Sequence, residues 1–175
     1  MIDKDDLINW LEKADKILDN KIEIIAVGGT AMTLLGLKSS TVDVDFCLDK
    51  KDVNYFKKVI DNEFRVDIFT DGFIFSEQLP SDYKEKSKEI RVMKNIILKA
   101  LDPVDIIITK AARFNARDSE DIEALAKHVN KKELAERFEK VIGSYAGNED
   151  EYKYHMNLMQ KSGKTPIFRL EISRF

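Results

Sequence analysis

The stretch IIAVGGTAMTLLGLKSSTVDVDFCL, residues 24–48, decides the fold that we expect for this chain. Its pattern predicts a buried strand, a glycine turn, a short helix, a polar loop and a second strand. Gly28 and Gly29 allow the backbone to turn tightly between the first strand and the helix. They also allow a ligand to approach the N–H groups at the start of that helix, where anions bind well. This part of the stretch therefore predicts an anion site.

Two acidic residues, Asp43 and Asp45, alternate with Val42, Val44 and Phe46 in the second predicted strand. Side chains two residues apart lie on the same face of a strand, so we expect both carboxylates on one face and the apolar side chains in the core. Two adjacent negative charges repel each other, and a bound cation removes that repulsion. Carboxylate oxygens suit hard divalent ions such as Mg²⁺. With the glycine turn, the pair predicts a site for metal-bound phosphate.

A third acidic residue, Asp67, lies in the segment FRVDIFT, residues 64–70. Val66 and Ile68 flank it, which predicts a third strand with Asp67 on the face opposite to theirs. A third carboxylate can complete the coordination of a metal ion and accept a proton from an attacking hydroxyl. Arg65 lies on the same predicted face as Asp67, and an ion pair between the two is the alternative.

The loop before the acidic pair contains Lys38, Ser39 and Ser40. One interpretation is a solvated polar connection. The other is a phosphate contact, because hydroxyls and an ammonium group suit phosphate oxygens.

The motifs GG-T-A at residues 28–31 and S-S-T-x-D-x-D at residues 39–45 resemble the signature of the nucleotidyltransferase fold shared by polymerase-beta-like enzymes. In that family two acidic residues in a strand follow the glycine pair, and a third acidic residue lies on a later strand, which Asp67 matches. The resemblance covers residues 22–125. It implies an α+β fold with a mixed β-sheet flanked by helices and a C-terminal helical annex.

The same resemblance implies roles for individual residues. Asp43 and Asp45 are expected to hold two Mg²⁺ (or Mn²⁺) ions, and Asp67 to hold the catalytic ion. The residues expected to contact the triphosphate of an NTP are Gly28, Gly29 and Thr30.

The apolar pattern places a boundary after residue 101. Residues 1–101 are predicted to form the α/β core, and residues 102–175 a C-terminal helical region packed on it. The segment LDPVDIIITKAARFNARDSEDIEAL, residues 101–125, is similar to the helical segment of a branch that includes the toxin component of AbiE-type toxin–antitoxin pairs.

Three basic residues of this helical region, Lys110, Arg113 and Arg117, share one helical stripe if the helix continues through them. Such a stripe predicts a basic face that meets a triphosphate or the backbone of an acceptor, with Lys110 and Arg117 as the binding residues. The alternative is a solvated face with local ion pairs to Glu120 or Asp121.

Composition limits the other function classes. The chain has 175 residues, is 43% hydrophobic and carries a formal net charge of −3, which gives no general attraction to nucleic acid. Its single cysteine, Cys47, excludes an intrachain disulfide. No apolar run reaches the roughly 18–20 residues of a membrane-spanning helix, so we expect a cytoplasmic protein without membrane contact.

These observations predict a Mg²⁺-dependent nucleotidyltransferase that moves a nucleoside monophosphate from an NTP to a hydroxyl. The acceptor hydroxyl belongs to a tRNA end, a protein side chain or a small molecule. The AbiE-like resemblance implies a toxin-like enzyme with an antitoxin partner. The alternatives are a non-catalytic nucleotide-binding or partner-binding module that keeps the fold, and a hydrolase or ligand sensor that uses the same phosphate site.

Overall fold

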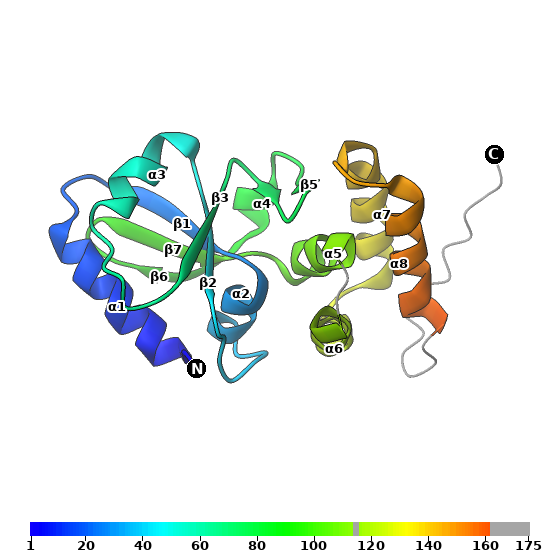
Figure 1. The fold of residues 1–175 in the computed structure, drawn as a ribbon, viewed down its shortest axis with the longest axis horizontal. Helices are drawn as coiled ribbons and strands as arrows, with labels where there is room; N and C mark the ends of the chain where they lie inside the picture. Colours follow the sequence, from blue (N-terminus) through cyan, green and yellow to red (C-terminus); the bar gives the residue numbers. More distant parts are fainter. Residues whose placement is uncertain (114–115, 162–175) are drawn as a thin grey trace. The chain divides into compact units, whose positions relative to one another are not determined.

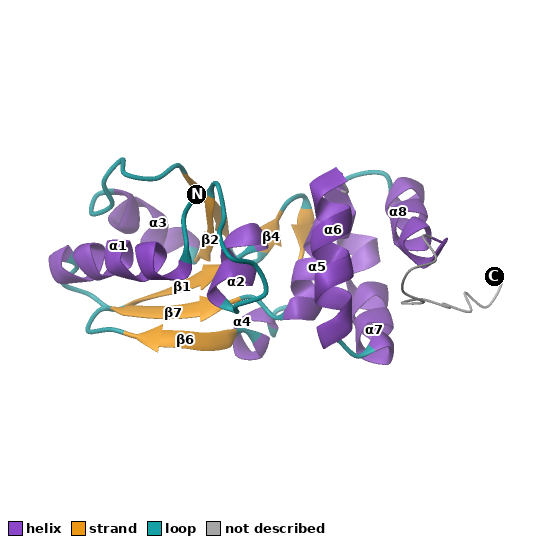
Figure 2. Cartoon of the chain, turned by 90° about the horizontal axis from the view of Figure 1, so that it is seen from below, coloured by secondary structure: helices purple, strands orange, loops and turns teal. Residues whose placement is uncertain are grey.

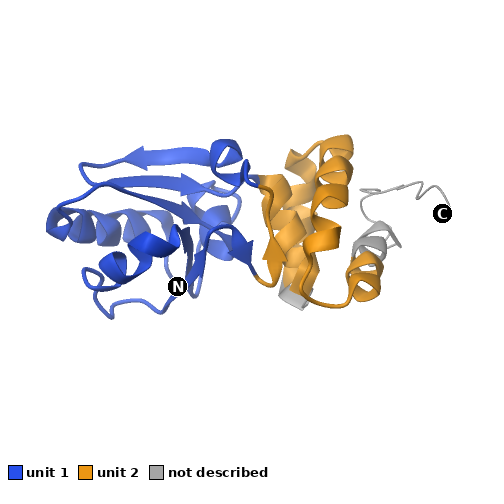
Figure 3. Ribbon diagram, turned by 90° about the horizontal axis from the view of Figure 1, so that it is seen from above, with its two compact units in different colours: residues 1–74, 81–102 blue, residues 75–80, 103–175 orange. Residues whose placement is uncertain are grey.

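The computed structural model describes the backbone of residues 1–113 and 116–161 and the side chains of residues 1–113 and 118–155. The chain forms two compact units (Figure 3). Unit 1 consists of residues 1–74 and 81–102, and unit 2 of residues 75–80 and 103–175. The sequence placed a boundary after residue 101 but did not predict that residues 75–80 group with the helical unit.

The strands form one mixed sheet in the order β5-β4-β3-β2-β1-β7-β6 (Figures 1 and 2). The β1–β7 and β2–β3 pairs are parallel, whereas β1–β2 and β6–β7 are antiparallel. The predicted α+β class, a mixed sheet flanked by helices, is confirmed. The strands are β1 (Ile22–Ala26), β2 (Val44–Leu48), β3 (Val66–Thr70), β4 (Phe73–Ile74), β5 (Glu77–Gln78), β6 (Lys88–Val92) and β7 (Ile96–Ala100).

Four helices lie in the sequence of unit 1 and the remaining helical segments in that of unit 2, as far as the structure describes them. No described helix combines the length and the apolar character needed to cross a bilayer. The helices of unit 1 are α1 (Lys4–Ile17), α2 (Gly28–Leu34), α3 (Lys50–Lys57) and α4 (Tyr83–Lys86). Those of unit 2 are α5 (Pro103–Arg113), α6 (Ala116–Leu125), η1 (Ala126–His128), α7 (Lys131–Val141), η2 (Ile142–Ser144) and α8 (Glu149–Lys161).

Phe46 of β2 lies at the centre of the core of unit 1. Its ring stacks on Trp10 of α1 with centroids 6.4 Å apart, and it meets Phe56 of α3 edge-on at 6.1 Å. Helices α1 and α3 therefore cover the sheet face that Phe46 occupies. Because side chains alternate along a strand, Asp45 and Cys47 project from the opposite face. The core thus determines which face carries the acidic residue.

The prediction that Val42 enters the core is wrong. Its side chain is 58% exposed, because β2 begins only at Val44 and residues 42–43 form a bend outside the strand. The period of two that places Val44 and Phe46 inside does not extend to a residue outside the strand.

Asp15 of α1 ties this helix to the β6–β7 hairpin. Its carboxylate oxygen Oδ1 accepts hydrogen bonds from the backbone N–H groups of Asn95 (2.7 Å) and Ile96 (2.8 Å), and the side chain is buried. Glu12, one turn earlier on the same helix, instead forms an ion pair with Arg91 at the surface.

We predict that Asp15→Ala lowers the free energy of unfolding by about 2–4 kcal/mol, because it leaves two buried N–H groups without an acceptor. Glu12→Ala is the matched control and is expected to lose less than about 1 kcal/mol, since its ion pair is exposed. Urea unfolding followed by circular dichroism measures both values. Equal losses in the two variants would contradict the anchoring role of Asp15.

Candidate functional site

The parallel pairing of β2 with β3 places Asp45 directly opposite Asp67. Strands in a sheet lie about 4.8 Å apart, and register partners on parallel strands project from the same face. The two carboxylates are therefore neighbours on the face opposite to Phe46. Of the predicted acidic set, these two residues are brought together by the sheet itself.

Asp43 lies in the bend before β2 and is partly buried. Among the described side chains, no group of three or more histidine, cysteine or acidic residues is arranged to hold a metal ion. The donor chemistry of the Asp45–Asp67 pair fits a hard divalent ion, since both residues offer carboxylate oxygens. That Asp43 joins them as a third ligand stays a prediction.

Two threonine hydroxyls fix the backbone around the acidic pair. The buried hydroxyl of Thr30 in α2 accepts a hydrogen bond from the Asp45 N–H (2.9 Å) and donates one to the Asp43 carbonyl (3.2 Å). The Thr41 hydroxyl donates to the same Asp43 carbonyl at 2.9 Å. We call Thr30 and Thr41 the hydroxyl clamp. Sequence reasoning gave Thr30 a triphosphate contact and missed Thr41, whose only signal was its place directly before the acidic strand.

The glycine turn has the backbone that the sequence predicted. Gly28 has a φ of +55°, in the left-handed region that favours glycine. A Cβ atom on Gly29 would lie 3.0 Å from the Oγ1 of Thr41, which the hydroxyl clamp holds in place. The residue that precedes the first turn of α2 is Val27, whose apolar side chain forms no capping hydrogen bond. The turn therefore brings bare backbone close to the segment that carries Asp43.

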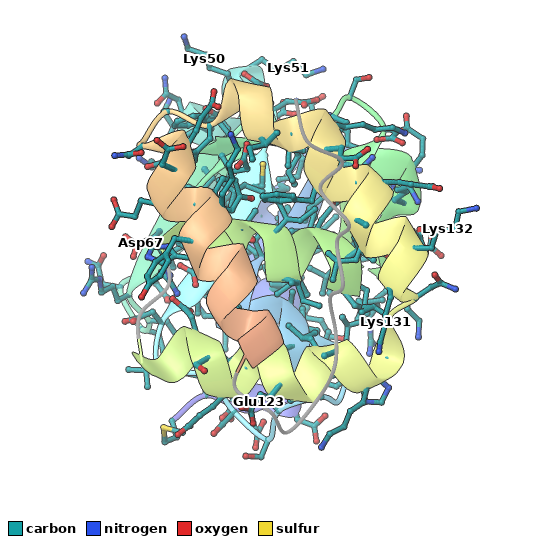
Figure 4. All side chains as sticks on the ribbon, turned by 90° about the vertical axis from the view of Figure 1, so that its right-hand side faces the viewer. Lys50, Lys51, Asp67, Glu123, Lys131 and Lys132 are labelled. Carbon is teal, nitrogen blue, oxygen red and sulfur yellow. The ribbon has the colours of Figure 1, made fainter. Side chains whose placement is uncertain are left out.

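Arg65 forms an ion pair with Asp67, with the Nη2 and Oδ2 atoms 3.5 Å apart. Both side chains are well exposed, at 74% for Arg65 and 48% for Asp67 (Figure 4, where Asp67 is labelled). The sequence offered this pair as the alternative to metal coordination by Asp67. Because the pair is exposed and in single contact, solvent screens it and a divalent ion can compete for the carboxylate.

The loop residues Lys38 and Ser39 are exposed, and Ser40 is partly buried. The loop connects α2 to the bend that holds Asp43, and it ends at Thr41, which pairs with Ile2 through backbone hydrogen bonds of 2.8 Å. Their contact with phosphate stays a prediction.

Lys110 lies inside unit 2 and is 2% exposed. Its Nζ donates to Asp118 (3.0 Å) and Asp121 (2.7 Å), and Arg113 pairs with Asp118 as well. These contacts match the ion-pair interpretation of this segment, and they leave the Lys110 amine directed at carboxylates within its own unit. The triphosphate role predicted for Lys110 therefore has no support in this arrangement.

Lys110 and Arg113 lie on α5 (Pro103–Arg113), whereas position 117 belongs to a separate helix, α6 (Ala116–Leu125). The side chain of Arg117, the other predicted binding residue of this region, lies outside the described residues.

Cys47 lies two residues after Asp45 on the same face, under Tyr83 of α4. It is 1% exposed, and burial raises the pKa of its thiol. A thiol that stays protonated is a poor nucleophile, so the candidate chemistry belongs to the carboxylates.

A family model described as "Nucleotidyltransferase of unknown function (DUF6036)" matches residues 5–163. The chain belongs to this family. The match spans both units, from α1 through the last described helix, and it agrees with the polymerase-beta-like resemblance of the glycine turn and the acidic strand. Comparisons with the curated proteins and with the solved structures find no match.

We predict that Thr30→Val lowers the free energy of unfolding by about 1–3 kcal/mol, because the Asp45 N–H then loses its buried acceptor. Thr33→Val is the matched control on the same helix. The Thr33 hydroxyl donates to the Gly29 carbonyl one turn earlier, a bond within the helix itself, so we expect a loss below about 1 kcal/mol.

Thr30→Ser keeps the hydroxyl and is expected to recover most of the stability in chemical denaturation. If valine and serine at position 30 were equally destabilising, the clamp would owe its effect to packing and not to hydrogen bonds.

Proposed function

We propose that this member of the DUF6036 family transfers a nucleoside monophosphate from an NTP to an acceptor hydroxyl. The observation that carries the proposal is the register that sets Asp45 beside Asp67, next to a glycine turn. Phosphoryl and nucleotidyl transfer depend on positioning and on neutralising charge, and two adjoining carboxylates suit that chemistry.

In the proposed reaction, the acceptor oxygen attacks the α-phosphorus of the NTP. The bond between that phosphorus and the oxygen bridging to the β-phosphate breaks, and pyrophosphate leaves. The acceptor proton passes to the carboxylate of Asp67, which acts as the general base. A divalent ion held by Asp45 and Asp67, with Asp43 as the predicted third ligand, would neutralise charge on the attacking and leaving oxygens.

Thr30 receives a different role in this proposal from the one predicted. Its hydroxyl is buried and already engaged by the backbone of Asp43 and Asp45, so it positions the acidic segment. Contact with the triphosphate is left to the backbone of Gly28 and Gly29 and to the loop residues Lys38 and Ser39.

The acceptor hydroxyl can belong to any of three classes of molecule, so the assay has to include all three. The net charge of −3 gives no general attraction to RNA, so protein and small-molecule hydroxyls stand beside a tRNA end. A toxin-like action with an antitoxin partner follows only from the AbiE-like resemblance. Co-purification with the product of an adjacent reading frame would test that partner.

A nucleotide-binding module without turnover is the second candidate. The ion pair between Arg65 and Asp67 favours it, since a divalent ion has to displace the guanidinium before Asp67 can serve as a ligand or base. The two candidates differ in one measurable respect: a binding module binds NTP but transfers nothing from it.

We predict that Asp45→Asn and Asp67→Asn each reduce Mg²⁺-dependent nucleotidyl transfer by about a hundredfold or more, because each removes charge stabilisation at the reacting phosphate. The assay incubates the full chain with α-labelled NTPs, Mg²⁺ or Mn²⁺, and total cellular RNA, protein or metabolites. Glu89→Gln is the matched control, since Glu89 is an exposed acidic residue on β6 and should keep full activity.

Calorimetric titration of Mg²⁺–NTP accompanies the transfer assay. Binding without transfer to any acceptor class would support the module without turnover. Transfer that survives in Asp45→Asn would exclude the proposed site, and a folded chain that binds no NTP would exclude both candidates.

A further inference from the structure

Residues 75–80, which include strand β5, belong to unit 2 although both flanking segments belong to unit 1. We call residues 75–80 the strap. Its first two residues have left-handed backbone, with φ of +48° at Phe75 and +69° at Ser76. Non-glycine residues rarely adopt this conformation, which costs about 1–2 kcal/mol per residue, so the surroundings must hold it in place.

Three contacts hold the strap within unit 2. The Ala146 N–H donates to the Ser76 carbonyl (3.1 Å), and the Ser144 hydroxyl donates to the Gln78 carbonyl (3.2 Å). The guanidinium of Arg113 lies over the ring of Phe75, 4.0 Å from its centroid. The strained backbone is therefore fastened near both ends of β5.

Glu77, at the centre of the strap, is fully buried, with 0% exposure. Neither carboxylate oxygen has a hydrogen-bond partner among the described residues. A carboxyl group in this setting favours its neutral form, because burial penalises its charge more than the nearby donors stabilise it.

The hydroxyls that face Glu77 donate their protons elsewhere. Tyr152 of α8 donates to the Ile108 carbonyl (3.1 Å), and Tyr145 donates to the Ala112 carbonyl (2.7 Å). The Ser144 hydroxyl of η2 has the carbonyls of Gln78 and Val141 as its acceptors. A protonated Glu77 can donate to one of these oxygens, whereas an ionised Glu77 competes with these carbonyls for the hydroxyl protons.

The cations of the neighbouring helices are matched to aspartates. Arg137 of α7 forms a bidentate pair with Asp105 of α5, with both N–O distances 2.8 Å. Lys110 and Arg113 of α5 share Asp118, and Lys110 also binds Asp121. None of these pairs includes Glu77, so they do not neutralise its charge.

We propose that the strap is a proton-dependent fastener of the helical unit, docked while Glu77 is protonated and released when Glu77 ionises. With the strap docked, the chain enters unit 2 through residues 75–80 and again after residue 102. With the strap released, unit 2 keeps only the segment that follows residue 102. The device thus adjusts how firmly residues 75–80 are held within the helical unit, and it does so independently of the proposed transferase activity.

The direction of the pH dependence follows from the two states of Glu77. Burial raises its pKa from 4.5 to about 7 in the docked strap, against smaller opposing effects from the Tyr152 and Ser144 hydroxyls and the Gln78 N–H. In the released strap the carboxyl meets water and has its ordinary pKa. Docking is therefore strongest below pH 4.5 and weakens as the pH rises to about 7, where the loss is complete.

Hydrogen exchange at the Ala146 amide of the full chain tests the proposal, because this N–H bonds to the strap. After correction for intrinsic exchange, we expect its protection to fall about 25-fold between about pH 5.5 and about pH 8. Glu77→Gln should show protection that is independent of pH. Glu139→Gln, an exposed glutamate on α7, is the matched control and should keep the pH dependence of the unmodified chain.

A pH profile that is identical in Glu77→Gln and in the unmodified chain would overturn the proposal, as would flat protection in the unmodified chain. The carboxyl carbon resonance of Glu77 gives a second measurement that needs no variant. A titration midpoint near 7 is expected in the folded chain, and a midpoint near 4.5 would overturn the proposal even if Glu77→Gln fails to fold.

Discussion

Burial of Phe46 between Trp10 and Phe56 is the constraint on which the rest of unit 1 depends. Burying a phenylalanine side chain contributes about 2–3 kcal/mol, and a slip of one residue in β2 would exchange its two faces. With Phe46 fixed inside, Asp45 must project from the other face of the sheet. The position of the candidate reactive carboxylate is therefore set by an aromatic cluster on the opposite side of the strand.

Hydrogen bonds from side chains fix the backbone just before β2. The strand begins at Val44, so Asp43 lies where the ladder no longer fixes the chain. The hydroxyl clamp of Thr30 and Thr41 takes over this task, and a Cβ atom at position 29 would crowd the Thr41 hydroxyl. The glycine turn and the acidic segment are thus structurally coupled, since the Thr41 hydroxyl lies next to Gly29 and also binds the Asp43 carbonyl.

Much of this arrangement could be predicted from the sequence, because local rules govern it. Alternating apolar residues identified β2 and β3, and the motif spacing predicted the nucleotidyltransferase character that the family description gives. The opposition of Asp45 and Asp67 was less accessible, because register depends on how two distant strands pair. The prediction that Val42 is buried was wrong for a related reason, since an alternating pattern does not show where a strand begins.

The helical unit was harder to predict. Helical periodicity placed Lys110 on a basic stripe, but Asp118 and Asp121 of α6 bind its amine. Charge pairing of this kind depends on how two helices pack against each other, which the spacing of like residues along one helix does not encode. The burial of Glu77 could not be predicted for the same reason, because the helices of its unit lie far along the chain.

The discontinuous composition of unit 2 has a consequence for how the protein is made. Residues 75–80 leave the ribosome well before residues 103–161, with the last strands of unit 1 in between. During synthesis residues 75–80, including Glu77, therefore stay exposed to water until the helices of unit 2 have been made. A fragment that begins at residue 103 would lack residues 75–80, which form part of the helical unit. The two units therefore cannot be separated into complete fragments by cutting the chain at one position.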